Sequence, residues 1–267
     1  MADNSLPFLG AASFDPSREI LALDMDGVII DSIRECLFNA YNAYADYCGD
    51  RHVPDEAALS ADWLKEARRL RNFIRQGEDY VYIAHAIHQN AAIENQQAFD
   101  AFTEQWRDLR QRFFDLIYHR RLEFSRETPH LWGELNPLYP GIHEFLTTYP
   151  HKENLYIITS KRLTFVEKIL QAHRIVLPQE NIFDTSAASK GEIIKRLLHE
   201  RACDARAFHF VDDQVDTLLK IKPLGINLYL AGWGYNNQDQ KKKAQNNNIP
   251  VLDLSEFYRR FGEPSSR

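Results

Sequence analysis

The chain has 267 residues, a length that suits one large domain or two smaller ones with a substantial core. Hydrophobic residues make up 44% of it and charged residues 26%, which is ordinary for a globular protein and excludes a disordered chain. The formal net charge of −6 gives no overall support for nucleic-acid binding, and no apolar run approaches the roughly 18 residues of a membrane span.

The cysteines and the N-terminal segment indicate the compartment. Three cysteines without a CxxC pair, Cys36, Cys48 and Cys203, argue against a disulfide framework and a structural zinc site. Residues 1–19 lack a basic segment followed by a long apolar one, so we expect no signal peptide. We therefore expect a cytoplasmic monomer or homodimer that binds neither nucleic acid nor membranes.

The first half of the chain predicts one strand and many helices. A short apolar run ending in acidic residues and glycine predicts a buried strand within residues 19–27. From Ser32 to Cys48 apolar residues recur at helical spacing, and helical patterns continue to about residue 124. Long loops without structure of their own are rare, so we predict an inserted helical domain.

After Pro137 strands and helices alternate. The predicted strands are 155–160, 207–213 and 226–232, and the predicted helices are 161–173, 190–202 and 215–220. This alternation predicts an α/β fold with a doubly wound, mostly parallel, Rossmann-like sheet. We expect a solvated loop over 238–248, then a short strand and a helix within 251–261. The predicted division is core 1–33, helical insert 34–137 and core 138–267.

Two aspartates follow the first predicted strand. Asp24 and Asp26 are two residues apart in LALDMDGV, so on an extended backbone they project to one side. Ligands of open α/β sheets bind just outside this end of the strands. One carboxylate could attack phosphorus while the other moves protons, and Gly27 allows a sharp turn. The alternative is that both aspartates only accept N–H groups in a turn or cap a helix.

A second acidic group follows the predicted strand that contains FHFV. It comprises Asp212, Asp213 and Asp216. Mg²⁺ prefers oxygen ligands, usually one or two carboxylates with waters and substrate phosphate. Acidic residues that end two strands of one sheet can meet at such an ion. The alternative is a solvated acidic loop that caps the next helix.

Hydroxyl and amino groups complete the candidate set. Thr159 and Ser160 follow the strand LYII, where a hydroxyl and backbone N–H groups suit a phosphate oxygen, although such residues also cap helices. Lys190 begins the predicted helix KGEIIKR and could hold a nucleophile and a phosphate together, although most lysines are simply exposed.

Together these segments resemble the four motifs of the haloacid dehalogenase superfamily, in its phosphoglycolate phosphatase-like branch. LALDMDGVIIDS resembles the first motif, YIITSK the second with Thr159 in the motif position, and FVDDQVDT the fourth. Lys190 lies where the branch has its third-motif lysine, and Lys161 competes for that role. LAGWGY and YPGIHEFL resemble further core segments, so the resemblance covers residues 19–33 and about 138–235.

The resemblance implies roles for the acidic residues. Asp24 would be the nucleophile and Asp26 the general acid and base. Mg²⁺ would be held by the Asp24 side chain, the Asp26 backbone carbonyl and an aspartate of the fourth motif. That motif usually has a second aspartate four residues after the ligand, whereas Asp216 follows Asp213 by three and Asp212 by four. We take Asp213 as the first choice and Asp212 as the second, with Asp216 left open.

The position of the helical insert resembles that of a C1-type cap, which closes over the site and contacts the substrate. Its richest segment is RRLRNFIRQGEDYVYIAH. Arg71 and Arg75 are one turn apart in the predicted helix, so both could reach one substrate anion, and Gly77 could end that helix. The alternative is a solvated helix face.

The resemblance implies a phosphatase that hydrolyses a small phosphomonoester through an aspartyl-phosphate intermediate. A mutase of the β-phosphoglucomutase kind keeps both aspartates and stays open as an alternative. A non-catalytic binding protein of the same fold is a further alternative, but it would usually lack Asp24 or Asp26. Dehalogenase chemistry is disfavoured because Asp26 supplies an acid and base that halide displacement does not need.

Overall fold

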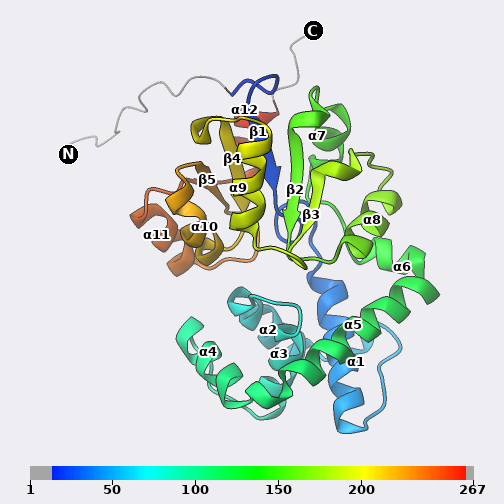
Figure 1. Cartoon of the computed structure of the whole chain (residues 1–267). Coiled ribbons are helices and arrows are strands. Elements are labelled where there is room, and N and C mark those ends of the chain that lie inside the picture. The colour runs from blue at the N-terminus through cyan, green and yellow to red at the C-terminus, as the bar shows by residue number, and fades with distance from the viewer. Residues whose placement is uncertain (1–13, 263–267) are drawn as a thin grey trace, which may run out of the picture.

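The computed structural model describes residues 14–262, so most of the segment inspected for a signal peptide lies outside the described residues. Six parallel strands form one sheet in the order β3-β2-β1-β4-β5-β6 (Figure 1). The strands are β1 (Ile20–Leu23), β2 (Leu155–Thr159), β3 (Ile182–Asp184), β4 (Phe208–Asp212), β5 (Asn227–Ala231) and β6 (Val251–Leu252). The predicted parallel α/β sheet is confirmed.

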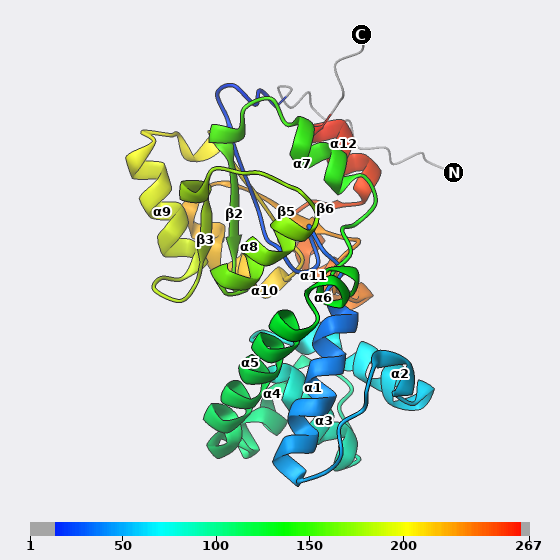
Figure 2. The same ribbon diagram turned by 90° about the vertical axis from the view of Figure 1, so that its right-hand side faces the viewer.

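Helices cover both faces of this sheet, as the rotated view shows (Figure 2). The covering helices are α7 (Ile142–Thr148), α8 (Leu163–Ala172), α9 (Lys190–Glu200), α10 (Val215–Ile221), α11 (Gln238–Asn246) and α12 (Leu254–Phe261). Side chains alternate along a strand, so Leu21 and Leu23 pack with α7, α8 and α12. Ile20 and Ala22 pack on the opposite face with α9 and α10.

A helical insert, residues 33–134, lies at the carboxyl end of the strands (Figures 1 and 2). It contains α1 (Ile33–Cys48), α2 (Ala61–Leu70), α3 (Asp79–His88), α4 (Gln96–Gln105), α5 (Arg110–Glu127) and α6 (Pro129–Glu134), with short 3₁₀ turns between some of them. The insert has its own buried apolar core, in which Leu37, Val81 and Phe113 are fully buried. The insert is therefore packed around a core of its own. Its inner surface lies opposite the carboxyl ends of the strands.

One predicted loop is wrong. Residues 238–246 form α11 instead of a solvated loop. The helix begins with a capping box, in which the Asn237 side chain accepts from the Gln240 backbone N–H and the Gln240 side chain accepts from that of Asn237. Ala244 is fully buried and packs in the core on the face of the sheet that α9 and α10 cover. One apolar contact and a good cap therefore sustain a helix in a segment that is otherwise polar.

The described residues bear on two further expectations. Cys36, Cys48 and Cys203 are all free thiols, as expected from their spacing. No helix among residues 14–262 is long and apolar enough to cross a membrane.

Candidate active site

The register of two central strands brings the two acidic motifs together. In the β1–β4 pair Leu23 lies opposite Val211, and the Asp24 N–H donates to the Val211 carbonyl at 3.0 Å. The next residues along the two strands, Asp24 and Asp212, therefore end up side by side, and both are buried. Strand β2 pairs with one side of β1, and β4 pairs with the other side, so the direction of the strand order reverses at β1. Such a reversal opens a crevice at the carboxyl ends of the strands.

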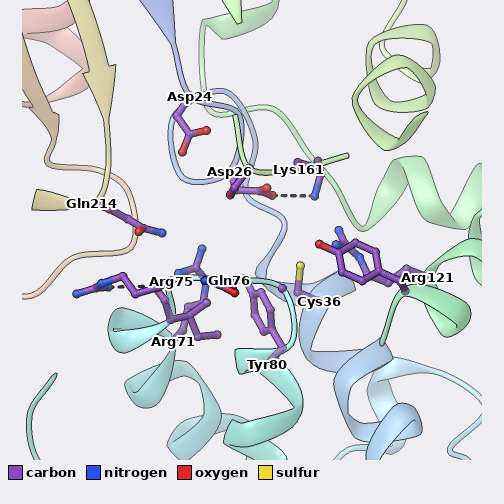
Figure 3. Close-up of a pocket in the computed structure, with 14 residues that line it drawn as sticks. Asp24, Asp26, Cys36, Arg71, Arg75, Gln76, Tyr80, Arg121, Lys161 and Gln214 are labelled. Atoms are coloured by element: carbon purple, nitrogen blue, oxygen red, sulfur yellow. Dashed lines mark hydrogen bonds and ion pairs between the residues drawn. The ribbon is translucent and has the colours of Figure 1, made fainter. Parts of the chain in front are cut away.

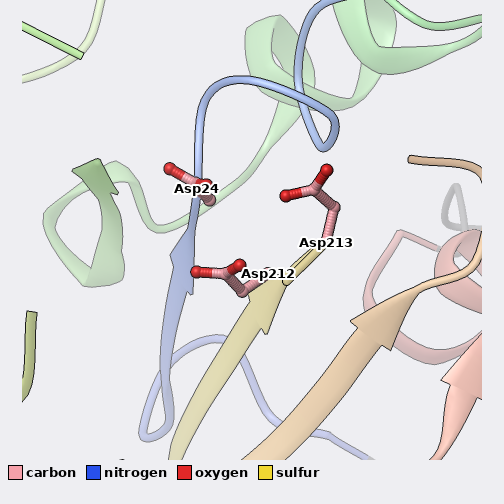
Figure 4. Close-up of side chains that lie close together, drawn as sticks. All are labelled: Asp24, Asp212 and Asp213. Atoms are coloured by element: carbon pink, nitrogen blue, oxygen red, sulfur yellow. The ribbon is translucent and has the colours of Figure 1, made fainter. Parts of the chain in front are cut away.

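Three carboxylates converge in this crevice (Figure 4). Oxygen atoms of Asp24, Asp212 and Asp213 lie within 4.8 Å of one another, and all three side chains are buried. Burial and the neighbouring carboxylates raise the pKa of Asp24 to about 6 and that of Asp213 to about 8. Oδ1 of Asp213 is buried and has no hydrogen-bond partner among the described residues. The oxygen-only ligand set and this free oxygen fit a hard divalent cation such as Mg²⁺.

Asp216 does not belong to this group. Its carboxylate pairs with Arg75 of the helical insert and with Lys243 of α11, the latter at 2.7 Å. Of the two residues that spacing left open, Asp212 lies beside Asp213 and Asp216 does not.

Two glycines allow the loops to close around Asp213. A Cβ atom on Gly27 would lie 2.2 Å from Oδ2 of Asp213, and one on Gly234 would lie 2.5 Å from the Asp213 Cβ. Gly27 also has a φ of +79°, which favours glycine. The Tyr235 N–H donates to Oδ2 of Asp213 at 2.9 Å. The segments LALDMDGV and LAGWGY therefore form the two walls that hold this carboxylate.

Lys190 lies between two of the carboxylates. Its Nζ is 3.0 Å from Oδ2 of Asp24 and 2.7 Å from Oδ2 of Asp212. Burial alone would lower the pKa of this ammonium, but the two carboxylates outweigh burial and raise it. The capping box of Ser189 and Glu192 fixes the first turn of α9, from which Lys190 projects. This geometry favours Lys190 over Lys161 for the electrostatic role beside Asp24.

Lys161 has a different partner. Its Nζ is 2.9 Å from Oδ1 of Asp26, and its side chain is 1% exposed. The Ser32 hydroxyl donates to the same oxygen. Burial raises the pKa of Asp26, but the charges of Lys161 and Arg121 and these hydrogen bonds outweigh it and lower the pKa to about 2. Asp26 is thus ionised in the ligand-free protein.

At the end of β2, its last residue is buried and the residue that follows is accessible. Thr159 is buried, and its hydroxyl oxygen accepts from the Lys161 N–H at 3.1 Å. Ser160 is exposed and lines the pocket that also contains Asp24 and Asp26. Of the two, Ser160 is the one whose hydroxyl can reach a ligand directly.

The pocket lies between the core and the helical insert (Figure 3). Figure 3 shows Asp24, Asp26 and Lys161 on the core side, facing Arg71 and Tyr80 of the insert. The remaining lining residues are Cys36, Ile74, Arg75, Gln76, Gly77, Tyr118, Arg121, Ser160 and Gln214. The cavity measures about 40 Å³, room for roughly three water molecules, so this conformation accommodates only a small ligand.

The predicted helix through Arg71 and Arg75 is wrong. Helix α2 ends at Leu70, Arg71 begins a short 3₁₀ turn, and backbone N–H groups of Arg75 and Gln76 donate to the Asp79 carboxylate. The two guanidinium groups therefore diverge. That of Arg71 is buried at the pocket, whereas that of Arg75 binds Asp216. Gly77 does not end the helix; it lines the pocket.

Several residues that line the pocket or contact its lining residues were not identified from the sequence. Arg121 makes a buried bidentate pair with Glu35, with both N–H···O distances at 2.9 Å. Ser32 and Tyr80 are ordinary members of predicted helical stretches until the fold brings them to the site. Tyr235 lies in a segment that drew attention only through its resemblance to the family.

Comparison with known proteins identifies the fold. No protein-family model and no curated protein matches the sequence. A haloacid dehalogenase-like hydrolase from Streptococcus pneumoniae superposes with a TM-score of 0.59 at 15% identity, over 92% of this chain and 98% of the other. A predicted phosphoglycolate phosphatase from Haemophilus somnus gives 0.59 at 14% identity, over 91% and 97%.

A structure from Lactobacillus delbrueckii subsp. bulgaricus gives a TM-score of 0.63 at 12% identity, over 94% of this chain and all of the other. At these identities the likeness concerns the fold. The chain has the fold of the haloacid dehalogenase-like hydrolases, as the resemblance of its motifs implied.

Proposed function

We propose that the chain is a Mg²⁺-dependent phosphatase of the haloacid dehalogenase superfamily, in the phosphoglycolate phosphatase-like branch, that hydrolyses a small phosphomonoester. One observation carries the proposal: Asp24, held by Lys190, lies beside Asp212 and Asp213 and opens onto the same pocket as Asp26. The likeness to a hydrolase and a predicted phosphatase of this fold supports it. In this proposal the core is 1–33 and 138–267, and residues 34–137 form a cap.

The first step is attack by an oxygen of Asp24 on phosphorus. A bond forms between Asp24 and the phosphoryl group while the ester P–O bond breaks, which divides a hard displacement into two easier ones. Lys190 keeps Asp24 ionised and orients it, because its Nζ contacts Oδ2 of Asp24 and leaves Oδ1, which accepts from the Met25 N–H. Ser160 is available for a phosphoryl oxygen.

Asp26 moves the proton in both steps. A bound phosphoryl group brings negative charge to the pocket, and like charges raise a carboxyl pKa, so Asp26 can then take up a proton. It gives this proton to the leaving oxygen. In the second step ionised Asp26 removes a proton from the water that attacks phosphorus, which releases phosphate and regenerates Asp24. Ser32 and Lys161 hold the Asp26 side chain in place throughout.

The cation site follows from the same carboxylates. Asp24, Asp213 and Asp212 would hold Mg²⁺, together with the backbone carbonyl of Asp26. Bound there, the ion supplies positive charge that lets a phosphate dianion approach three aspartates. Lys190 cannot do this alone, because two of those carboxylates already neutralise its charge.

The test is turnover of an aryl phosphate by the purified chain, with Mg²⁺ and with EDTA. We expect hydrolysis that requires Mg²⁺ and is restored when the ion is returned. A complete lack of turnover under both conditions would instead favour a non-catalytic binding protein. A panel of phosphorylated metabolites, read for phosphate release against isomerisation, distinguishes a phosphatase from a mutase and identifies the best substrate by kcat/KM.

A further inference from the structure

Resting on the proposed phosphatase function, we infer that Arg71 and Tyr80 form a subsite for a second anionic group of the substrate, separate from the phosphoryl group at Asp24. The physiological substrate is then a small phosphomonoester that also carries a carboxylate or a second phosphate. The inference depends on the burial of Arg71, its lack of a partner and its position in the pocket.

Arg71 is a deeply buried cation. Arg71 is only 3% exposed. Its guanidinium carbon lies 3.9 Å from the centroid of the Tyr235 ring and 5.2 Å from that of the Tyr80 ring. Stacking on aromatic faces occupies the flat sides of a guanidinium and leaves its N–H edge for other partners. Burial alone would lower the pKa of the Arg71 guanidinium, but neighbouring side chains outweigh burial and raise it, so Arg71 stays charged.

That charge has no ionic partner among residues 14–262. No carboxylate lies within 4.0 Å of the guanidinium, its N–H groups make no hydrogen bond there, and its Nε is fully enclosed. The other cations of the pocket are all satisfied. Lys161 pairs with Asp26, Arg75 with Asp216, and Arg121 with Glu35. A buried charge without a partner is costly, so a site that retains one is suited to a ligand that provides the counter-charge.

Tyr80 adds a second free donor. Its ring lies against Arg71, and its hydroxyl is buried without a hydrogen-bond partner among the described residues. A guanidinium and a phenol side by side match the oxygens of a carboxylate or a phosphate. Both face Asp24 and Asp26 across the pocket in Figure 3. The small cavity requires the second anion to lie close to the phosphoryl group.

Asp213 does not fill the role of partner. Burial raises the pKa of Asp213, and the nearby charge of Arg71 lowers it by a smaller amount. The two side chains nevertheless form no ion pair within 4.0 Å. Asp213 is also a proposed cation ligand, so its charge is used elsewhere when Mg²⁺ is bound. The guanidinium edge is then still without a carboxylate.

The test uses a matched pair of substrates and a matched pair of arginines. The substrates are 3-phosphoglycerate and glycerol 3-phosphate, which have the same chain length. The first carries a carboxylate where the second carries a neutral hydroxymethyl group. A three-carbon bisphosphate tests a second phosphate in place of the carboxylate. The variants are Arg71→Met, which keeps the length of the side chain, Arg71→Lys, and Tyr80→Phe, which removes only an unpaired hydroxyl. The control is Arg68→Ala on α2, whose side chain is 45% exposed.

We expect the wild-type protein to prefer 3-phosphoglycerate or the bisphosphate, which carry a second anionic group, over glycerol 3-phosphate. Arg71→Met should reduce that preference in kcat/KM by about 10- to 100-fold, the usual effect of losing a charge-assisted hydrogen bond. Arg71→Lys should retain part of it, and Arg68→Ala should leave it unchanged. Titration of 3-phosphoglycerate or of the bisphosphate into an inactive Asp24→Asn protein, with and without Arg71→Met, measures the same loss as binding.

The outcomes separate this inference from the proposed function. If no phosphomonoester is hydrolysed, the phosphatase proposal fails. If glycerol 3-phosphate is hydrolysed as well as 3-phosphoglycerate and the bisphosphate, or if Arg71→Met leaves the preference unchanged, the phosphatase proposal stands and the second-anion subsite is refuted. Tyr80→Phe gives an independent measure, because its hydroxyl has no hydrogen-bond partner among the described residues that the substitution would remove.

Discussion

Asp24 and Asp26 are two residues apart, yet their surroundings differ. Lys190 and two other carboxylates contact or flank Asp24, whereas Lys161 and Ser32 bind Asp26. In catalytic dyads, distinct environments assign distinct roles to like residues. The roles proposed here can therefore be tested one residue at a time.

Replacing the nucleophile should stop the reaction. We expect Asp24→Asn to abolish hydrolysis of an aryl phosphate, because the amide has the same shape but cannot form the acyl phosphate. Asp26→Asn should lose about 10²- to 10⁴-fold in kcat, the usual contribution of general acid and base catalysis. Steady-state kinetics measure both. The fully exposed Asp108 provides the control Asp108→Asn, and near-wild-type turnover by Asp24→Asn would refute the mechanism.

The proposed cation ligands can be tested against Asp216, the third acidic residue of their motif. We expect Asp213→Asn to weaken Mg²⁺ binding at least about 10-fold, as loss of a charged oxygen ligand should. Asp216→Asn should leave it unchanged, since Asp216 binds Arg75 and Lys243 instead. Calorimetric titration of Mg²⁺ gives the affinities directly. If Asp216→Asn weakened Mg²⁺ binding and Asp213→Asn did not, Asp216 would be the ligand in place of Asp213.

The proximity of Asp24 and Asp212 could be predicted from the sequence, because both stand at the carboxyl ends of paired strands in a parallel sheet. The contact of Lys161 with Asp26 and that of Arg121 with Glu35 could not be predicted, because they join residues 135 and 86 positions apart. Long side chains from distant segments leave no local pattern.

At the scale of elements, two departures share a cause. Helix α11 forms in a polar segment because of a cap and one buried alanine. The predicted helix through Arg71 and Arg75 instead ends at Leu70, where the chain turns to bury Arg71 and Phe73. Periodicity describes the average face of a segment, whereas caps and single buried side chains decide where a helix begins and ends.

Helices α10 and α11 meet the turn after α2 in a contact that joins the insert to the core. Arg75 pairs with Asp216, and the Gln240 side chain donates to the Asn72 carbonyl at 2.8 Å. A double-mutant cycle with Arg75→Gln and Asp216→Asn should give a coupling free energy of roughly 0.5–1 kcal/mol, because both side chains are partly exposed and water screens the pair. Denaturant unfolding measures it.

The same cycle on Arg69 and Glu66 serves as the control, since that pair lies within one helix and joins no other element. If the Arg75–Asp216 coupling is zero within error, the contact does not hold the insert against the core. If the insert acts as the proposed cap, its closure would then depend on the ligand alone.

At the scale of the whole molecule, the acidic cluster links stability to pH and to the cation. Burial and like charges raise the pKa of Asp24 to about 6 and of Asp213 to about 8, above the ordinary 3.8. A raised pKa means that the folded state binds more protons than the unfolded state. Without Mg²⁺, stability from these groups is therefore complete below about pH 4 and is lost as the pH rises through 6 to 8.

Mg²⁺ should reverse this loss, because the ion binds the ionised carboxylates of the folded state only. At 100 times its dissociation constant it adds about 2.7 kcal/mol, which for a chain of this size is roughly 5–10 °C in Tm. In EDTA we expect Tm to fall between pH 5 and 8.5, and the Mg²⁺-induced rise in Tm to grow over the same range. Asp213→Asn, which mimics the protonated form, should flatten both trends, whereas Asp216→Asn should keep them. A Tm in EDTA that rises with pH across this window, with the same Mg²⁺ effect at pH 5 and pH 8, would show that the three carboxylates do not share a cation.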